Sequence, residues 1–175
     1  MESRDKYRIA LLSAYALALH GLESLIPMPI PWLRAGIANI ITLTALVLFG
    51  FRAAMMVTMT RVTLASIFGG SFLGPGFILS MGGGVAGTLS MGIVFALVPR
   101  LFGPVGLSLI GALFHNLSQL FLGYLLFIQK IEPIIMITPV LVLLGTITGV
   151  VNGLVADLLI KNLKNGKDPF QNNAT

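Results

Sequence analysis

The sequence predicts an all-α, polytopic membrane protein with six transmembrane helices. Of its 175 residues, 56% are hydrophobic and only 10% are charged, whereas a soluble domain has about 25% charged residues. Several uncharged runs reach the roughly 20 apolar residues that a membrane-spanning helix needs. Lysine and arginine also gather on one side of the predicted membrane. We therefore expect lipid to surround most of the chain, and we expect no separate soluble domain.

Proline, glycine and charged residues divide the chain into six apolar segments. The predicted spans are residues 7–26, 33–49, 53–70, 75–98, 104–128 and 133–160. They form a domain over residues 7–160, between a cytoplasmic segment (1–6) and a polar cytoplasmic tail (161–175). The first twenty residues imitate a signal peptide, but apolar character continues to Ile26, so we interpret them as a retained helix. The sixth span is long enough to tilt or bend.

The distribution of basic residues predicts the orientation. With a cytoplasmic N-terminus, the outer loops hold two basic residues and the cytoplasmic segments hold eight. The outer pair is Arg34 and Lys130, and the inner set is Arg4, Lys6, Arg8, Arg52, Arg100, Lys161, Lys164 and Lys167. Both termini are therefore expected in the cytoplasm of a bacterium, with the protein multi-pass in its inner membrane. We interpret the net charge of +5 as this orientation signal and expect no nucleic-acid partner.

Composition also limits the chemistry. The absence of cysteine excludes disulfides, thiolate metal sites and cysteine nucleophiles. The six acidic residues are scattered and form no aspartate-rich motif for Mg²⁺. The glycine run Gly82-Gly83-Gly84 lacks the lysine and the preceding strand of a phosphate-binding loop. We therefore expect no catalytic centre, no metal and no cofactor, and no use of ATP by this chain itself.

Polar residues inside the spans are the candidate site, because ionisable side chains in hydrocarbon cost about 2.5–3.5 kcal/mol and normally face a cavity or a partner. His20 and Glu23 lie three residues apart on one helix face, and His115 and Gln119 lie four apart on another. These residues lie in the outer or middle parts of their spans, so they can converge on one outward-facing pocket. The candidate set is His20, Glu23, Arg34, Asn39, Arg61, His115, Asn116 and Gln119.

Other interpretations stay open for individual residues. Any single amide can instead form an interhelical hydrogen bond, worth about 0.6 kcal/mol on average. Arg61 can bind an anion or a carboxylate in the pocket, or it can snorkel to the cytoplasmic surface. Asp157, within one turn of the cytoplasmic end, is interpreted as interfacial. The proline-rich loop at residues 27–32 is either a lid over the pocket or a rigid connector.

Two stripes of small residues predict close helix packing. Gly145, Gly149 and Gly153 recur every four residues on the last span. Ala10, Ala14 and Ala18 make a similar stripe on the first span. Such stripes usually serve internal packing, whereas an outward-facing stripe would be a docking surface for another membrane protein.

These motifs together resemble a known family. They are His20-Gly21-Leu22-Glu23, the proline loop, the run from Arg34 to Ile40, Arg61, and the run from His115 to Gln119. Over roughly residues 10–159 the chain resembles the Gx transporter family, also labelled heptaprenyl diphosphate synthase component I. The resemblance implies the six-helix fold of the substrate-binding S components of energy-coupling factor (ECF) transporters. It also implies a site that opens outward under the first loop, and an alanine stripe on the first helix that meets the coupling subunit.

The leading hypothesis is an S component that takes up a small vitamin-like or precursor molecule. The candidate set would bind this substrate, and the basic bias of the set favours an anionic or hydrogen-bond-rich ligand. A coupling membrane subunit and ATPases would act in trans, with Ala10, Ala14 and Ala18 as the docking stripe. The alternative is a non-catalytic membrane subunit that assists prenyl diphosphate or quinone synthesis. A third interpretation is a purely structural scaffold, for which the polar set would be dispensable.

Overall fold

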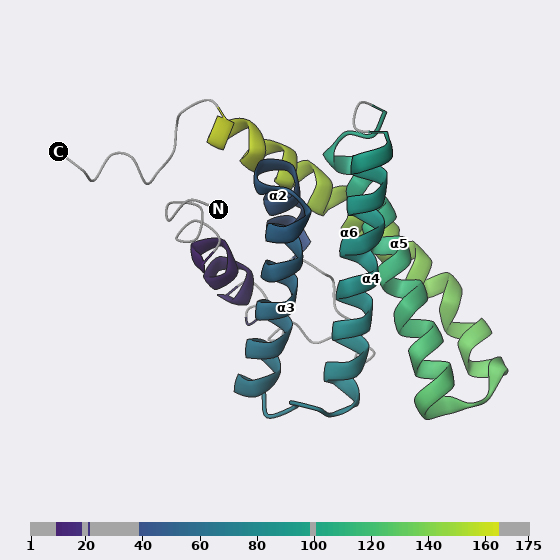
Figure 1. Cartoon of the computed structure of the whole chain (residues 1–175). Coiled ribbons are helices and arrows are strands. Elements are labelled where there is room, and N and C mark those ends of the chain that lie inside the picture. Colours follow the sequence, from purple (N-terminus) through teal and green to yellow (C-terminus); the bar gives the residue numbers. More distant parts are fainter. Residues whose placement is uncertain (1–9, 19–20, 22–38, 99–100, 165–175) are drawn as a thin grey trace.

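The structure of the chain is a computed structural model that describes residues 10–18, 21, 39–98 and 101–164. All regular secondary structure in these ranges is helical, which confirms the all-α class. Residues 10–18 form part of the first helix. The later elements are α2 (Asn39–Phe49), α3 (Phe51–Phe68), α4 (Pro75–Leu97), α5 (Pro104–Gly123), the π-helical turn η1 (Tyr124–Ile128) and α6 (Ile131–Lys164) (Figure 1).

Proline and glycine set several helix boundaries. Pro75 and Pro104 occupy the first turns of α4 and α5, where the missing amide proton costs no helical hydrogen bond. Gly50 alone connects α2 to α3 and has a φ of 85°, a conformation that side-chain-bearing residues rarely adopt. The α3 helix therefore begins two residues before the predicted start. The α6 helix is longer than predicted at both ends and contains Pro139, which removes one backbone hydrogen bond.

Successive helices run in opposite directions along the molecule (Figure 1). The end of α3, the start of α4, the end of α5 with η1, and the start of α6 lie together at the lower end of Figure 1. Under the predicted orientation this is the outer end. The closest packing joins α4 to α5 and α5 to α6, and α2 packs against α3 and α6.

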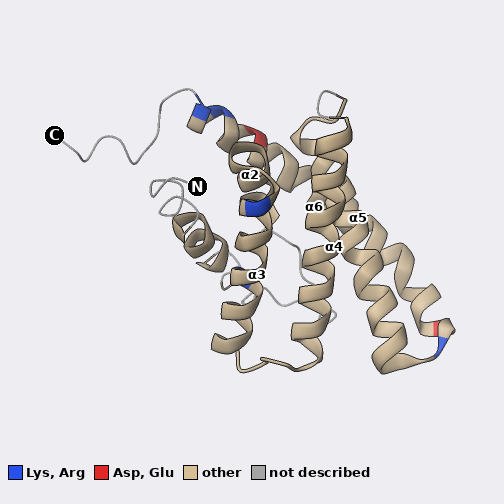
Figure 2. Cartoon of the chain, viewed as in Figure 1, with Lys and Arg blue, Asp and Glu red and all other residues tan. Residues whose placement is uncertain are grey.

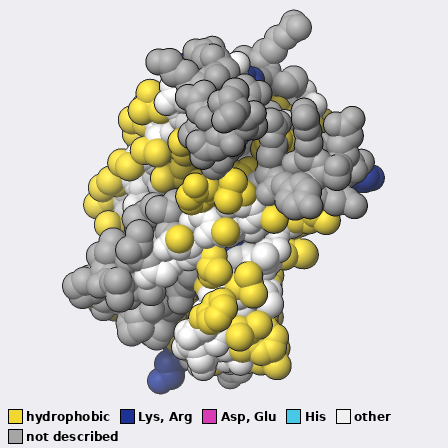
Figure 3. Space-filling model, turned by 90° about the vertical axis from the view of Figure 1, so that its left-hand side faces the viewer, with side chains coloured by type: hydrophobic (Ala, Val, Ile, Leu, Met, Phe, Trp, Pro, Cys, Tyr) yellow, Lys and Arg dark blue, Asp and Glu magenta, His cyan; other side chains and the backbone are white. Residues whose placement is uncertain are grey.

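The surface of the described chain is that of a membrane protein. Three described helices are long and apolar enough to cross a bilayer, namely Pro75–Leu97, Pro104–Ile128 and Ile131–Lys164, and Asn39–Phe49 is a shorter apolar helix. Figure 2 shows long stretches of these helices without any charged residue, and Figure 3 shows hydrophobic side chains spread over one face. At 34 residues, α6 is about 51 Å long, which exceeds a hydrocarbon core of ~30 Å and favours a tilt. Six spanning helices stay a prediction.

Glycines bring α4, α5 and α6 into close contact. A methyl group on Gly87 of α4 would lie 2.9 Å from the Gly111 carbonyl oxygen of α5. On α6, a methyl group on Gly153 would lie 2.5 Å from Val105 Cα of α5, and one on Gly149 would lie 3.3 Å from Ala112 Cβ. The packing role predicted for the glycine stripe of the last span is thus confirmed.

Candidate functional site

The structure brings Asn39 and Arg61 together, as the sequence predicts for part of the candidate set. Arg61 Nη2 donates a hydrogen bond to Asn39 Oδ1 at 3.3 Å, linking α3 to the first residue of α2. The Arg61 side chain is buried, at 4% exposure. It lies ten residues from the start of α3, or about 15 Å. This burial is at odds with snorkelling, in which the guanidinium would be exposed.

His115 and Gln119 lie one turn apart on α5 and pack against Gly83 of α4. A methyl group on Gly83 would lie 3.0 Å from Gln119 Cγ and equally close to Cε1 and Nδ1 of His115. Gln119 is buried. The Nδ1 atom of His115 is buried too. It has a weak polar contact with the Gly83 backbone but no hydrogen bond of normal geometry within the described ranges. Gly83 therefore provides the space in which both side chains meet α4.

The next glycine of the run faces Arg61 instead. A methyl group on Gly84 would lie 3.9 Å from Arg61 Nη2, whereas His115 meets the adjacent Gly83. The sequence excludes this glycine run as a phosphate-binding loop. In the structure, the run places backbone without side chains between Arg61 and His115. Asn39, Arg61, His115 and Gln119 form one track of polar side chains, which we call the polar track.

Asn116 has a different position from its neighbours. Its Nδ2 donates a hydrogen bond to the Leu141 carbonyl oxygen of α6 at 2.9 Å, and it approaches Gly145 closely. The amide thus forms the interhelical hydrogen bond that the sequence leaves open as an alternative. Because Leu141 lines the pocket described next, this hydrogen bond fixes the position of the pocket wall that α6 forms.

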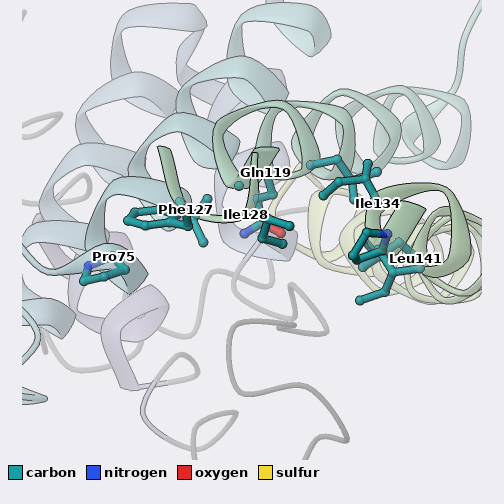
Figure 4. A pocket seen from close by; sticks show the side chains of 11 residues that line it. Pro75, Gln119, Phe127, Ile128, Ile134 and Leu141 are labelled. Atoms are coloured by element: carbon teal, nitrogen blue, oxygen red, sulfur yellow. The ribbon is translucent and has the colours of Figure 1, made fainter. Parts of the chain in front are cut away.

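A pocket of about 410 Å³ lies between the start of α4, the end of α5, η1 and the start of α6 (Figure 4). Gln119 is the polar side chain among its described lining residues, and it is also the outermost member of the polar track on α5. The other lining residues are Pro75, Leu79, Leu120, Gly123, Phe127, Ile128, Pro133, Ile134, Ile137 and Leu141. The sequence predicts an outward-facing pocket, but its apolar lining was missed, because the π-helical turn η1 that supplies Phe127 and Ile128 has no clear sequence signal.

Three predicted site residues, His20, Glu23 and Arg34, lie outside the described residues, as does the proline loop. Their roles stay predictions. The alanine stripe is described: Ala10, Ala14 and Ala18 are exposed, whereas Ala16 on the same helix is completely buried in the core. Within the described ranges, no group of three or more His, Cys, Asp or Glu residues is placed to hold a metal ion.

Sequence reasoning missed a chain of three buried threonines. The Oγ1 atoms of Thr42 and Thr58 lie 3.3 Å apart, and those of Thr58 and Thr88 lie 2.9 Å apart. Thr88 Oγ1 also donates to the Gly84 carbonyl oxygen at 2.8 Å. The chain joins α2, α3 and α4 about one turn from the Asn39–Arg61 pair, so it fixes the helices that carry that pair. The spacing Asn39 to Thr42 and Thr58 to Arg61, three residues in each helix, was the available signal.

Thr58→Val is expected to lower the free energy of unfolding by about 1 kcal/mol, because two interhelical contacts of ~0.6 kcal/mol each are lost at unchanged side-chain volume. Thr58→Ser keeps the hydroxyl and should retain more of that stability. Thr146→Val is the matched control, since the exposed Thr146 hydroxyl bonds only within its own helix. Thermal unfolding in mild detergent measures all three. Equal stability of Thr58→Val and Thr146→Val would contradict a structural role for the threonine chain.

Comparison with known proteins gives a family and a fold. The model of the family described as heptaprenyl diphosphate synthase component I matches residues 12–159. No curated protein matches the chain. A solved structure of the S component of a bacterial ECF transporter superimposes with a TM-score of 0.73, covering 96% of this chain and 99% of that one, at 20% identity. Agreement over both whole chains shows a shared fold.

Proposed function

The chain belongs to the heptaprenyl diphosphate synthase component I family, and from this premise and its S-component fold we propose that it is the substrate-binding membrane subunit of an ECF-type transporter. It takes up a small vitamin-like or precursor molecule and has no catalytic activity of its own. The observation that carries this proposal is the pocket of about 410 Å³, from which the polar track continues through Gln119 and His115 to Arg61. A cavity of this size with few polar groups is typical of small-molecule sites.

The residues of the track have distinct roles in this proposal. Gln119 contacts the substrate at the pocket wall, and His115 offers a second polar group one turn deeper. Arg61, held by Asn39, supplies positive charge. His20, Glu23 and Arg34 are proposed to complete the site from the first helix and the loop that follows it, while Asn116 secures the α6 wall.

Energy is proposed to come from partner proteins. Ala10, Ala14 and Ala18 present an exposed strip of methyl groups, which allows another membrane helix to approach closely. We assign this strip to the coupling subunit, which would link the protein to ATPases in trans.

The proposed setting is the bacterial inner membrane with both termini in the cytoplasm. The cationic Lys161 and Lys164 near the end of α6 then lie inside, and Asp157 pairs with Lys161 at 2.6 Å in the same region. The pocket, formed by the opposite ends of α4, α5 and α6, opens outward. A substrate would therefore enter from outside the cell.

Ala14→Leu is expected to release the coupling subunit without releasing the bound small molecule, because a larger side chain blocks close helix approach at an exposed position that is not among the described residues lining the pocket. The measurement is purification of the tagged protein in mild detergent, followed by mass spectrometry of the proteins and small molecules that accompany it. Leu11→Ala, at an exposed position on the same helix, is the control and should retain both.

Two outcomes would contradict the transporter proposal. Wild-type protein that carries neither a small molecule nor a coupling subunit would overturn it. Co-purification with a soluble, aspartate-rich prenyl diphosphate synthase whose activity rises in the complex would instead support the alternative of an assisting membrane subunit, which the name of the family favours.

A further inference from the structure

The apolar character of the pocket restricts the substrate more than the sequence does. The sequence predicts a pocket made from eight polar residues, yet among the described lining residues only Gln119 has a polar side chain. Leucine, isoleucine, phenylalanine, proline and one glycine form the rest of the described wall (Figure 4). Against these described walls, hydrogen-bonding groups on the body of a substrate would find no side-chain partner, and each unpaired buried group weakens binding by about ten-fold.

Among the described lining residues, a polar side chain meets the pocket at one side, where Gln119 lies. Gln119 can both donate and accept a hydrogen bond. One turn deeper, His115 has a buried Nδ1 without a normal hydrogen bond in the described ranges, and Arg61 Nη2 approaches Gly84, the neighbour of the Gly83 that His115 meets. No described residue of the pocket lining is acidic. The electrostatic environment at this side therefore favours a negatively charged or hydrogen-bond-accepting group.

We propose, on the basis of the function proposed above, that the substrate is a small amphiphilic anion. Its apolar body fills the pocket, and its single anionic end lies at Gln119 and His115, directed toward Arg61. The volume of about 410 Å³ corresponds to about fourteen water molecules at ~30 Å³ each, which suits a free small molecule. A membrane lipid offers the same combination of acyl chain and anionic group, so the test must separate the two sources.

Binding of two amphiphilic anions of similar size, radiolabelled decanoate and radiolabelled 4-phenylbutyrate, tests this class. The protein is placed in nanodiscs of phosphatidylcholine, a zwitterionic lipid. We expect saturable binding of at least one of the two probes. Unlabelled decanol, which has the body without the charge, should compete at least ten-fold more weakly than decanoate. Gluconate, a hydrophilic anion of similar size, should not compete.

The matched variant is Gly123→Leu, in which the larger side chain should close the pocket. Gly123 lines the pocket, and a methyl group there would meet nothing within 4 Å, so leucine extends into empty space. We expect at least a ten-fold loss of affinity. Gly76→Leu is the control, because Gly76 also has open space but does not line the pocket. In a second variant, Gln119→Leu, decanoate should no longer bind more tightly than decanol.

The outcomes separate the substrate class from the transporter function. Equal competition by gluconate, or no saturable binding of either probe, would overturn the amphiphilic anion. Binding that survives Gly123→Leu would overturn its placement in the pocket, and displacement of the probe by anionic phospholipid added to the nanodiscs would show a lipid site instead. A hydrophilic molecule co-purifying with an intact coupling subunit would refute the class while supporting the transporter, whereas loss of every ligand and partner would refute both.

Discussion

Replacing Arg61 with alanine is expected to weaken substrate binding by about 10- to 150-fold, the equivalent of one charge-assisted hydrogen bond of about 1.5–3 kcal/mol. The reason is that Arg61 is the buried cation beside His115. Lysine should restore binding only in part, because its point charge does not reproduce the planar guanidinium that bonds Asn39. The measurement is the affinity for decanoate or 4-phenylbutyrate in nanodiscs, together with retention of the native ligand through purification.

Two comparison variants distinguish a binding role from a structural one. Asn39→Ala breaks the same α2–α3 hydrogen bond but leaves the cation in place, so its effect on binding should be much smaller. Arg52→Ala removes an exposed arginine from the same helix and should leave binding unchanged. If Arg61→Ala and Asn39→Ala reduce binding equally, Arg61 only holds the helices together. Binding that is unaffected by Arg61→Ala would remove this residue from the site.

The sequence predicts the helical class and the main helix boundaries well, because the signals are local. Pro75 and Pro104 begin helices for reasons contained in the proline ring itself. That Arg61 has a partner is predictable too, since a cation in a membrane helix needs one, but the sequence does not indicate Asn39 as that partner. Which partner it finds depends on the one-residue turn at Gly50, which sets how α2 and α3 align.

The pocket and the threonine chain depend on relations between helices that sequence patterns do not contain. Thr42, Thr58 and Thr88 are each acceptable in an apolar helix, and only their meeting across three helices makes them a network. The apolar wall likewise depends on the π-helical turn that follows Gly123 and brings Phe127 and Ile128 to the pocket. Asn39, Arg61, His115 and Gln119 lie near one another in the described part of the chain, and their role in binding stays a prediction. The shape of the pocket had to come from the structure.

Alanine at Gly153 is expected to lower the free energy of unfolding by about 1–3 kcal/mol, which corresponds to a fall of roughly 2–12 °C in Tm. The added methyl group would lie 2.5 Å from Val105 Cα, 3.1 Å from Val105 N and 3.2 Å from the Pro104 carbonyl oxygen. These are backbone atoms of the first turn of α5, which cannot rotate away as a side chain can. The helices must therefore separate. Thermal unfolding measured by light scattering or tryptophan fluorescence in detergent gives the size of the effect.

The expected loss of stability differs between the glycines of the stripe. At Gly149 the methyl group would meet Leu109 Cδ2 at 3.2 Å and Ala112 Cβ at 3.3 Å, distances that small shifts can relieve, so alanine should cost less than at Gly153. Gly76→Ala, with nothing within 4 Å, is the control and should be neutral or slightly stabilising in its helix. A Gly153→Ala protein as stable as the Gly76→Ala protein would show that α5 and α6 pack less tightly than the structure indicates.

Alanine at Gly145 should separate packing from ligand binding. Its methyl group would collide with the Asn116 amide nitrogen, the atom that donates to the Leu141 carbonyl oxygen. Because Leu141 lines the pocket, this variant should weaken ligand binding as well as stability. Gly153, which packs against the opposite end of α5, should affect stability alone once the protein is folded. Measured together, the two variants test whether all glycines of the stripe serve helix packing alone, or whether Gly145 also supports the pocket.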